Sequence, residues 1–258
     1  MNLTAFTYRS RWAALLAAVP LLAACGGDPG AGRDGAPPGL GRGSHLVITT
    51  DNGVRLRPAE DDRVVIEARI EGGWSHRDDT WVLDLSCPGD EEPAPDGPGN
   101  HEDGRCPRMP AVGIPAGVPV TVTAQNAGID VAGVATALDL TTVNGDVTVA
   151  RSGRDDATVR LVTRNGSVRA GTLSSARLHA QTVNGDVTLA STTSPARLDA
   201  ATTNGSVRVS LPSDAPEYAA DATTRNGRTS VAFPSATEGN GHDMTLTTVN
   251  GDVTATRG

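Results

Sequence analysis

Apolar and polar residues alternate along the chain on both sides of a recurring Asn-Gly dipeptide. Relative to each asparagine, positions −6 and −4 hold apolar or small residues, position −2 is always threonine, and positions +3 and +5 are apolar in all but one case. A period of two is typical of a strand that buries one face. Each copy therefore predicts a strand, an Asn-Gly turn and a second strand.

The copies return with a period near 20 residues, which is typical of a repeat architecture. The segment TTVNGDVT occurs at 141–148 and at 247–254, with QTVNGDVT at 181–188. Successive asparagines lie 21, 19, 20, 22 and 24 residues apart. The threonine and the asparagine of each copy are the predicted ladder residues: Thr142, Asn144, Thr163, Asn165, Thr182, Asn184, Thr202, Asn204, Thr224, Asn226, Thr248 and Asn250.

Recurrence of the same residue type, beyond its polarity, favours a single-stranded, β-helix-like solenoid. Coils spaced by about 4.8 Å place threonine over threonine and asparagine over asparagine, and stacking buries one narrow core. We expect an all-β stack of about seven coils of about 20 residues, wound in sequence order, with an open edge after Val253. Two-residue Asn-Gly hairpins would give the same alternation, so an antiparallel β-sandwich or meander is the alternative.

The pattern weakens upstream of the regular copies. Residues 120–133 keep alternating apolar positions around Asn126, and further strands are expected at Val64–Ile70 and Thr80–Leu85. Terminal repeats are commonly irregular because they cap the stack. We therefore expect an irregular N-terminal part before the regular repeats.

The first 25 residues are typical of a bacterial export signal. Arg9 and Arg11 precede an apolar run, Ala13–Ala24, which ends at Cys25. A helix of twelve residues is about 18 Å long, too short for a bilayer core of about 30 Å. The residues Leu22–Cys25 resemble the lipobox of bacterial lipoproteins. This resemblance implies acylation of the cysteine and anchoring on the extracellular face of the cytoplasmic membrane.

A stretch rich in glycine and proline follows the cysteine and predicts a flexible tether. The expected organisation is a signal peptide at 1–24, a tether at 25–43 and a repeat domain at 44–258, divided into an irregular part at 44–119 and regular repeats at 120–258.

The other two cysteines, Cys87 and Cys106, predict a disulfide, because an even pair in an exported protein is typically oxidised. Such a bond would contribute about 3 kcal/mol in the chain-entropy model. The loop that it closes, 87–106, carries six carboxylates and His101. Its spacing matches no calcium motif, so we interpret it as a solvated acidic loop and predict no metal site.

Two outward-facing positions, +2 and +4 relative to each asparagine, change residue type from one copy to the next. Like charges on neighbouring strands destabilise a sheet by up to about 1 kcal/mol, and the alternation avoids them. We interpret the pattern as a solubility device in preference to a binding row. Position +2 reads Asp146, Ser167, Asp186, Ser206, Arg228 and Asp252, and position +4 reads Thr148, Arg169, Thr188, Arg208, Ser230 and Thr254.

Composition and motifs limit the chemistry. A net charge of −8 does not favour nucleic acid as a partner. No HExxH, paired CxxC or GxSxG motif occurs, so we expect no cofactor and predict that the protein is not an enzyme. The alternative is a polysaccharide-active β-helix enzyme that uses Asp146 and Asp186, about 9.6 Å apart in the stack.

Several phrases carry a family resemblance: VGIPAGVPVTV at 112–122, VSLPSDAPEYAADATTRNG at 209–227 and the repeated T-x-N-G-x-V. With the export signal, they resemble the bacterial putative-adhesin family, a domain of unknown function with β-strand repeats, over about 44–258. The resemblance implies a solenoid on the cell surface without established catalytic residues. Expected partners are the membrane, through the lipid on Cys25, and an envelope protein or a glycan. A sensor or accessory role in an envelope-stress system is a further alternative.

Overall fold

The computed structural model describes residues 39–40, 43–66, 73–86, 109–232 and 241–258. The chain divides into Met1–Gly32, outside the described residues, and Arg33–Gly258, to which the following description applies. The regular elements of the described residues are all β-strands, and none of these residues forms a helix that could cross a membrane.

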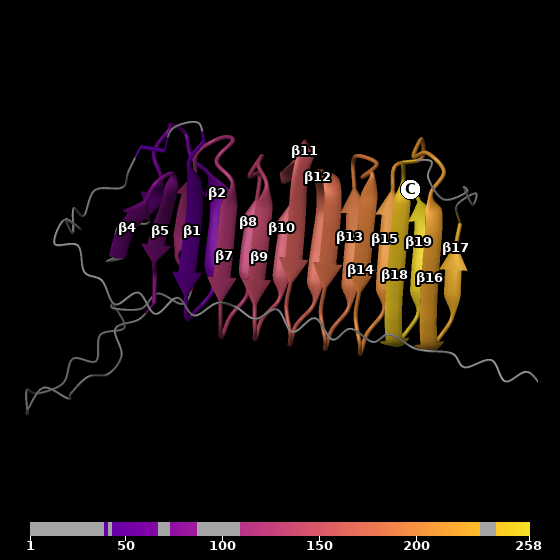
Figure 1. The fold of residues 1–258 in the computed structure, drawn as a ribbon. Helices are drawn as coiled ribbons and strands as arrows, with labels where there is room; N and C mark the ends of the chain where they lie inside the picture. The colour runs from indigo at the N-terminus through magenta and orange to yellow at the C-terminus, as the bar shows by residue number, and fades with distance from the viewer. Residues whose placement is uncertain (1–38, 41–42, 67–72, 87–108, 233–240) are drawn as a thin grey trace, which may run out of the picture. The chain divides into compact units, whose positions relative to one another are not determined.

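Two sheets make up the fold (Figure 1). The pre-turn sheet is named for the strands of the regular repeats, which precede the Asn-Gly turns. Its stacking order is β4 (Gly73–Arg77), β5 (Thr80–Asp84), β1 (His45–Thr50), β7 (Val120–Ala124), β9 (Leu138–Thr142), β11 (Gly153–Val162), β12 (Val168–Gln181), β14 (Arg197–Ala201), β18 (Asp243–Asn250) and β16 (Ala219–Asn226). The long strand β12 takes part in both sheets. The stacking order of the post-turn sheet is β3 (Val65–Ile66), β6 (Ala111–Ile114), β2 (Val54–Pro58), β8 (Ile129–Ala132), β10 (Val147–Ala150), β12, β13 (Val187–Ser191), β15 (Val207–Leu211), β19 (Val253–Arg257) and β17 (Thr229–Val231).

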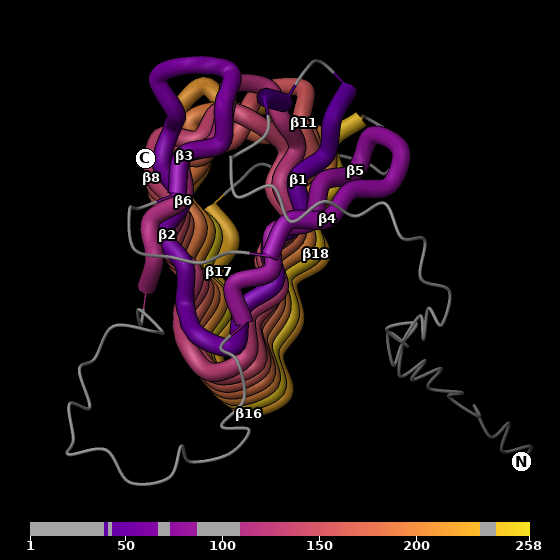
Figure 2. Tube along the Cα trace, turned by 90° about the vertical axis from the view of Figure 1, so that its left-hand side faces the viewer, coloured from indigo at the N-terminus to yellow at the C-terminus, as the bar shows by residue number. Residues whose placement is uncertain are grey.

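Strands of neighbouring coils pair in parallel and in register. Val168 of β12, for example, lies between Val147 of β10 and Val187 of β13. Seen end-on, the coils superimpose and their turns nest at one edge (Figure 2). The prediction of an all-β solenoid is confirmed, and the antiparallel sandwich of Asn-Gly hairpins is wrong.

A narrow apolar core runs between the two sheets. It consists of the alternate inward side chains that the sequence pattern predicted, such as Leu140, Leu161, Val168 and Val187, none of which is exposed to solvent. Because a lone coil cannot bury these side chains, stacking is what removes them from water.

The order of the coils departs from the sequence at both ends. The last strands, β18 and β19, lie between the coil of β14 and β15 and the coil of β16 and β17. At the other end, β1 is the first strand in the sequence, but it lies between β5 and β7 in the stack. Stacking in sequence order and an open edge after Val253 were therefore wrong predictions. Strand β19 is paired on both sides, and the last coil is formed by β16 and β17.

The N-terminal end of the stack is closed by antiparallel strands, β4 on β5 and β3 on β6. Trp74 and Trp81 pack against the end of the core, with ring centroids 6.4 Å apart, and His76 stacks on Trp81 at 4.5 Å. The strand predicted at Thr80–Leu85 corresponds to β5. The one predicted at Val64–Ile70 is described only as β3, because residues 67–72 lie outside the described residues.

Candidate interaction surface

A column of asparagine side chains follows the turns of the stack. Each side-chain amide donates to the side-chain oxygen of the asparagine in the neighbouring coil, over 2.7–3.3 Å. The column begins at Asn126, and Asn250 stands between Asn204 and Asn226, as the order of the strands requires. In stacking order it comprises Asn126, Asn144, Asn165, Asn184, Asn204, Asn250 and Asn226.

From Asn144 onward in the column, the glycine after each asparagine is required by the close approach of neighbouring turns, whereas Asn126 is followed by Ala127. A Cβ on Gly185 would lie 2.6 Å from the carbonyl carbon of Gly166 and would overlap its oxygen. The φ of Gly185, +151°, is also one that other residues rarely adopt. A side chain at Gly185 would therefore push the turn of Gly166 away from its place in the stack.

In each Asn-Gly copy, the threonine two residues before the asparagine points inward and bonds to the neighbouring backbone. Thr163 Oγ1 donates to the carbonyl of Gly145 over 2.7 Å, and Thr182 Oγ1 donates to that of Gly166 over 2.8 Å. Each threonine hydroxyl thus bonds to a carbonyl of the adjacent turn. The same bond recurs from Thr142, Thr202, Thr224 and Thr248.

An outward row of aspartates and serines binds the backbone of the next coil. Asp146 Oδ1 accepts from the Ser167 amide over 2.7 Å, and Asp186 Oδ1 accepts from the Ser206 amide over 2.8 Å. In stacking order, aspartate and serine alternate as far as Asp252, whose oxygen accepts from the Arg228 amide. The row that we interpreted as a solubility device therefore also fixes the turns to one another.

Arginines of the post-turn sheet pair with these aspartates. Arg169 donates to Asp146, and Arg208 donates to Asp186 over 3.2 Å, in both cases one coil away. Partial burial raises the pKa of Asp146, but the Ser167 amide and the Arg169 guanidinium outweigh it, so the net pKa lies below its usual range. The post-turn face is thus a row of fixed ion pairs that repeats every second coil.

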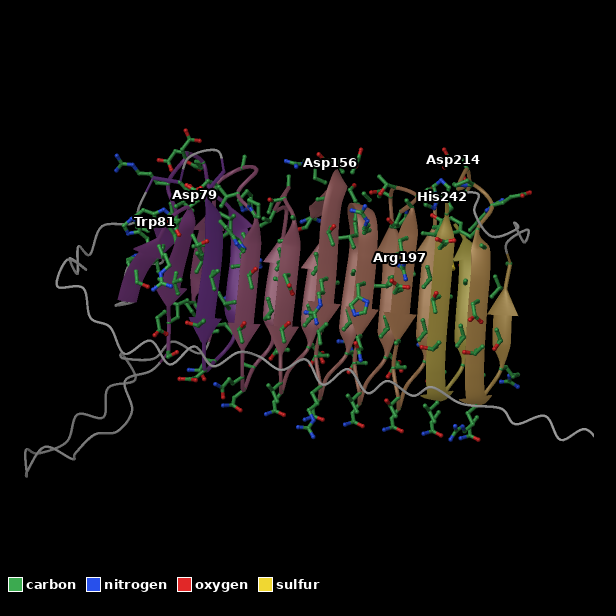
Figure 3. All side chains as sticks on the ribbon, viewed as in Figure 1. Asp79, Trp81, Asp156, Arg197, Asp214 and His242 are labelled. Atoms are coloured by element: carbon green, nitrogen blue, oxygen red, sulfur yellow. The ribbon has the colours of Figure 1, made fainter. Side chains whose placement is uncertain are left out.

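The pre-turn face carries a second row, centred on His179. Arg160 pairs with Asp139 over 3.0 Å, and Arg197 pairs with Asp199 over 3.0 Å. His179 lies between Arg160 and Asp199 in the register of the strands. Burial, followed by the charge of Arg160, lowers its pKa despite the opposing effect of Asp199. Figure 3 shows polar side chains along this part of the stack, with Arg197 labelled.

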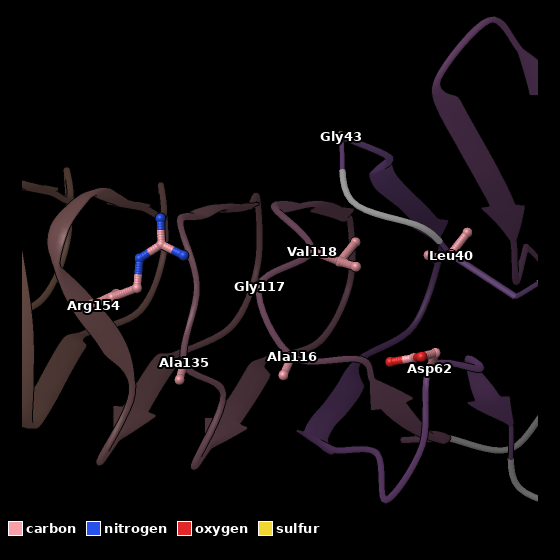
Figure 4. Close-up of a pocket in the computed structure, with 8 residues that line it drawn as sticks. All are labelled: Leu40, Gly43, Asp62, Ala116, Gly117, Val118, Ala135 and Arg154. Atoms are coloured by element: carbon pink, nitrogen blue, oxygen red, sulfur yellow. The ribbon is translucent and has the colours of Figure 1, made fainter.

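A hollow of about 650 Å³ lies near the N-terminal end, lined by Leu40, Gly43, Asp62, Ala116, Gly117, Val118, Ala135 and Arg154 (Figure 4). Its charged side chains do not converge on one point, and Arg154 already pairs with Asp156. The hollow therefore lacks the converging polar groups of a small-molecule site.

Several predicted site residues lie outside the described residues. These are Cys25, Cys87, Cys106 and the acidic loop between the last two. Among the described residues, no group of three or more histidine, cysteine, aspartate and glutamate side chains could hold a metal ion. Sequence reasoning missed the backbone bonds of Asp146 and Asp186, although the alternation of aspartate and serine was visible.

The fold and these rows define the protein as a parallel β-solenoid with an ordered polar exterior. Residues 119–256 match the family described as "Toastrack DUF4097", and because the match spans more than half of the chain, the protein belongs to this family. The resemblance to an adhesin-like domain of unknown function is thereby confirmed.

A crystal structure of a "putative cell adhesion protein" from Clostridium sporogenes is similar, at 12% identity and a TM-score of 0.36, and the similarity covers 88% of this chain and 95% of that chain. No curated protein matches the sequence.

Proposed function

We propose that this protein is a non-catalytic, adhesin-like interaction module of the bacterial envelope. Membership in the family supports this class. The observation that carries the proposal is the row of ion pairs on the post-turn face. Arg169 and Arg208 hold equivalent positions two coils apart, about 9.6 Å, each fixed by an aspartate of the neighbouring coil. A rigid row with this spacing suits a partner with regularly repeated acceptor groups.

The arginines keep the capacity to bind such a partner. The side chains of Arg169 and Arg208 are each 54% exposed although they are paired. A guanidinium has five N–H donors, so it can hold its aspartate and still donate to an incoming carboxylate, carbonyl or hydroxyl. An extended envelope protein or a glycan presents such groups in a regular row.

The proposal includes a lipid anchor at Cys25, a tether at 26–43 and a disulfide between Cys87 and Cys106. A diacylated cysteine holds a protein at a membrane surface, and a glycine- and proline-rich segment of 18 residues spans roughly 23 Å as a random coil. A stack of about seven coils of about 20 residues would then be presented outside the cytoplasmic membrane.

Binding to isolated envelope material tests the proposal. The full chain with Cys25→Ser is mixed with purified cell-wall glycan and, separately, with solubilised envelope proteins, and co-sedimentation and crosslinking are measured. We expect binding that the pair Arg169→Ala and Arg208→Ala weakens. The pair Arg160→Ala and Arg197→Ala on the pre-turn face is the matched control. Absence of binding to both materials would contradict the proposal.

A polysaccharide-active enzyme is the less supported candidate. An inverting glycosidase needs one carboxylic acid that stays protonated, and therefore has a raised pKa. The amide and guanidinium that surround Asp146 lower its pKa instead. If Asp146→Asn or Asp186→Asn abolished the turnover of a glycan by this protein, the enzyme would replace the interaction module. A role as a sensor of envelope stress would leave the binding experiment unchanged but would require a membrane partner protein.

A further inference from the structure

The C-terminal end of the stack differs from the other end in its outermost strands, which run parallel to their neighbours. Strand β16 pairs with β18, and β17 pairs with β19, but no strand of the described residues pairs with the far side of either (Figure 1). At the opposite end, β3 and β4 provide antiparallel closing strands. β16 is eight residues long and contains neither proline nor glycine. It therefore lacks the proline that often stops an edge strand from pairing.

The backbone of β16 sets which residues can pair across this edge. The Ala219 amide donates to the His242 carbonyl at the start of the pairing with β18, over 2.9 Å. Peptide groups of successive residues in a strand point to opposite sides. The amides and carbonyls of Ala220, Ala222 and Thr224 therefore point toward the open edge, and those of Asp221 and Thr223 point toward β18.

The outward side chains of β16 are Asp221, Thr223 and Arg225, all exposed. Within the part of the chain that the structure describes, the side chains of Asp221 and Arg225 form no ion pair or hydrogen bond. Aspartates and arginines in the middle of the stack, such as Asp186 and Arg208, are paired across neighbouring coils. The end strand thus carries one charge of each sign, two residues on either side of Thr223.

We propose that a second copy of this chain pairs with β16 in antiparallel fashion, about a two-fold axis through Thr223. In this register Ala222 of one copy and Thr224 of the other exchange two backbone hydrogen bonds, in agreement with the direction of their peptide groups. Asp221 then lies opposite Arg225 in a non-hydrogen-bonded pair, in which side chains approach most closely. The dimer contains this charge pair twice.

Other two-fold registers lose the charge pair. An axis through Ala222 places Asp221 opposite Thr223, and an axis through Asp221 or Arg225 places like charges opposite each other. The self-complementary sequence around Thr223 therefore selects both the partner, a second copy, and the register.

Charge reversal tests the dimer. The full chain with Cys25→Ser is studied by sedimentation equilibrium over a range of concentrations. We expect association to twice the 26.4 kDa mass of one chain, and a dissociation constant about tenfold higher for Asp221→Arg or Arg225→Asp, because each change places two like-charge pairs across the axis. Mixing these two variants should restore tight association, since each then meets the opposite charge. Asp155→Arg, at an exposed position of β11, is the matched control.

A chain that stays monomeric up to about 1 mM, or reversals that leave association unchanged, would overturn the proposal. Cysteine crosslinking tests the register independently. Residues on the axis of a non-hydrogen-bonded pair have Cα atoms about 4.5 Å apart, within disulfide range, whereas Asp221 would lie about 14 Å from its copy. Thr223→Cys should therefore crosslink two chains and Asp221→Cys should not; equal crosslinking at both positions would also overturn it.

Discussion

In the middle of the stack each coil is paired on both sides, whereas the coil of β16 and β17 is paired on one side only among the described residues. The burial of the side chains differs between these coils in the same way. The middle coil of β12 and β13 buries Leu178 and Val187 completely or almost completely, while Ala222 and Val231 of the end coil are small or partly exposed. In a stack with contacts only between neighbours, stability depends on the interfaces that each coil makes. The end coil should therefore open more easily than the middle coils.

At the N-terminal end of the stack, the outermost coil and the end of the core are covered by other elements. Antiparallel strands cover the edge there, and Trp74 and Trp81 close the end of the core. At the C-terminal end, a buried and hydrogen-bonded tyrosine lies beside the last coil. Tyr218 is fully buried, its hydroxyl donates to the Pro195 carbonyl over 2.8 Å, and burial raises its pKa to about 12 although Ser194 opposes the shift.

The largest difference between middle and end is expected for a buried charge. Val187→Asp places a carboxylate in the closed core and should destabilise the fold by about 4 kcal/mol or more, because the charge has no partner. Thr229→Asp, at the equivalent position of the end coil, and Thr188→Asp, on the outer face, should each cost about 0.5 kcal/mol. Urea unfolding measures all three. Similar losses for Val187→Asp and Thr188→Asp would mean that the faces of the strand are wrongly assigned.

A smaller loss is expected where two middle turns touch. Gly185→Ala places a Cβ against the carbonyl of Gly166 and should cost about 3 kcal/mol, since the neighbouring backbone is held from both sides. Gly171→Ala is the control, because a Cβ there has open space. Thermal unfolding of the two variants should differ clearly. If both unfold alike, the turns do not stack closely.

The asparagine column allows a direct comparison of middle and end. Asn204 donates to Asn184 and accepts from Asn250, whereas Asn226 only donates to Asn250 within the column. Asn204→Ala should therefore cost about 2 kcal/mol and Asn226→Ala about 1 kcal/mol, since each lost hydrogen bond contributes about 1 kcal/mol. Urea unfolding of each single variant provides the measurement. A larger loss at Asn226 would contradict the stacking order.

The smallest effect concerns pH. The pKa of His179 is lowered in the folded protein, chiefly by burial, so the unfolded chain binds a proton more readily below its usual pKa of about 6.5. Folding stability should consequently fall as the pH drops from about 6.5 toward the lowered pKa. The free energy of unfolding at pH 7.5 and 5.5 should differ less in His179→Gln than in the parent. Identical differences in both proteins would exclude this contribution.

Much of the middle of the molecule follows from the sequence. The alternation around each asparagine identified the strands and their buried face, and the recurrence of residue type indicated stacked coils. The role of Gly185 and its equivalents depends on how closely neighbouring turns approach, and this distance is a property of the assembled stack. The bonds of Thr163 and Asp146 to neighbouring backbone depend on it in the same way.

The sequence by itself determined the repeat, the faces of the strands and the single narrow core, because these depend on residue types a few positions apart. Only the tertiary structure decided which coils are neighbours. Pairing between coils is governed by the match of their side chains, and a connecting loop costs little entropy when it is lengthened by several residues. The copy at 247–254 therefore lies beside the coil of β14 and β15, where Asp252 follows Ser206 in the alternating row. The less regular copy of β16 and β17 remains at the end.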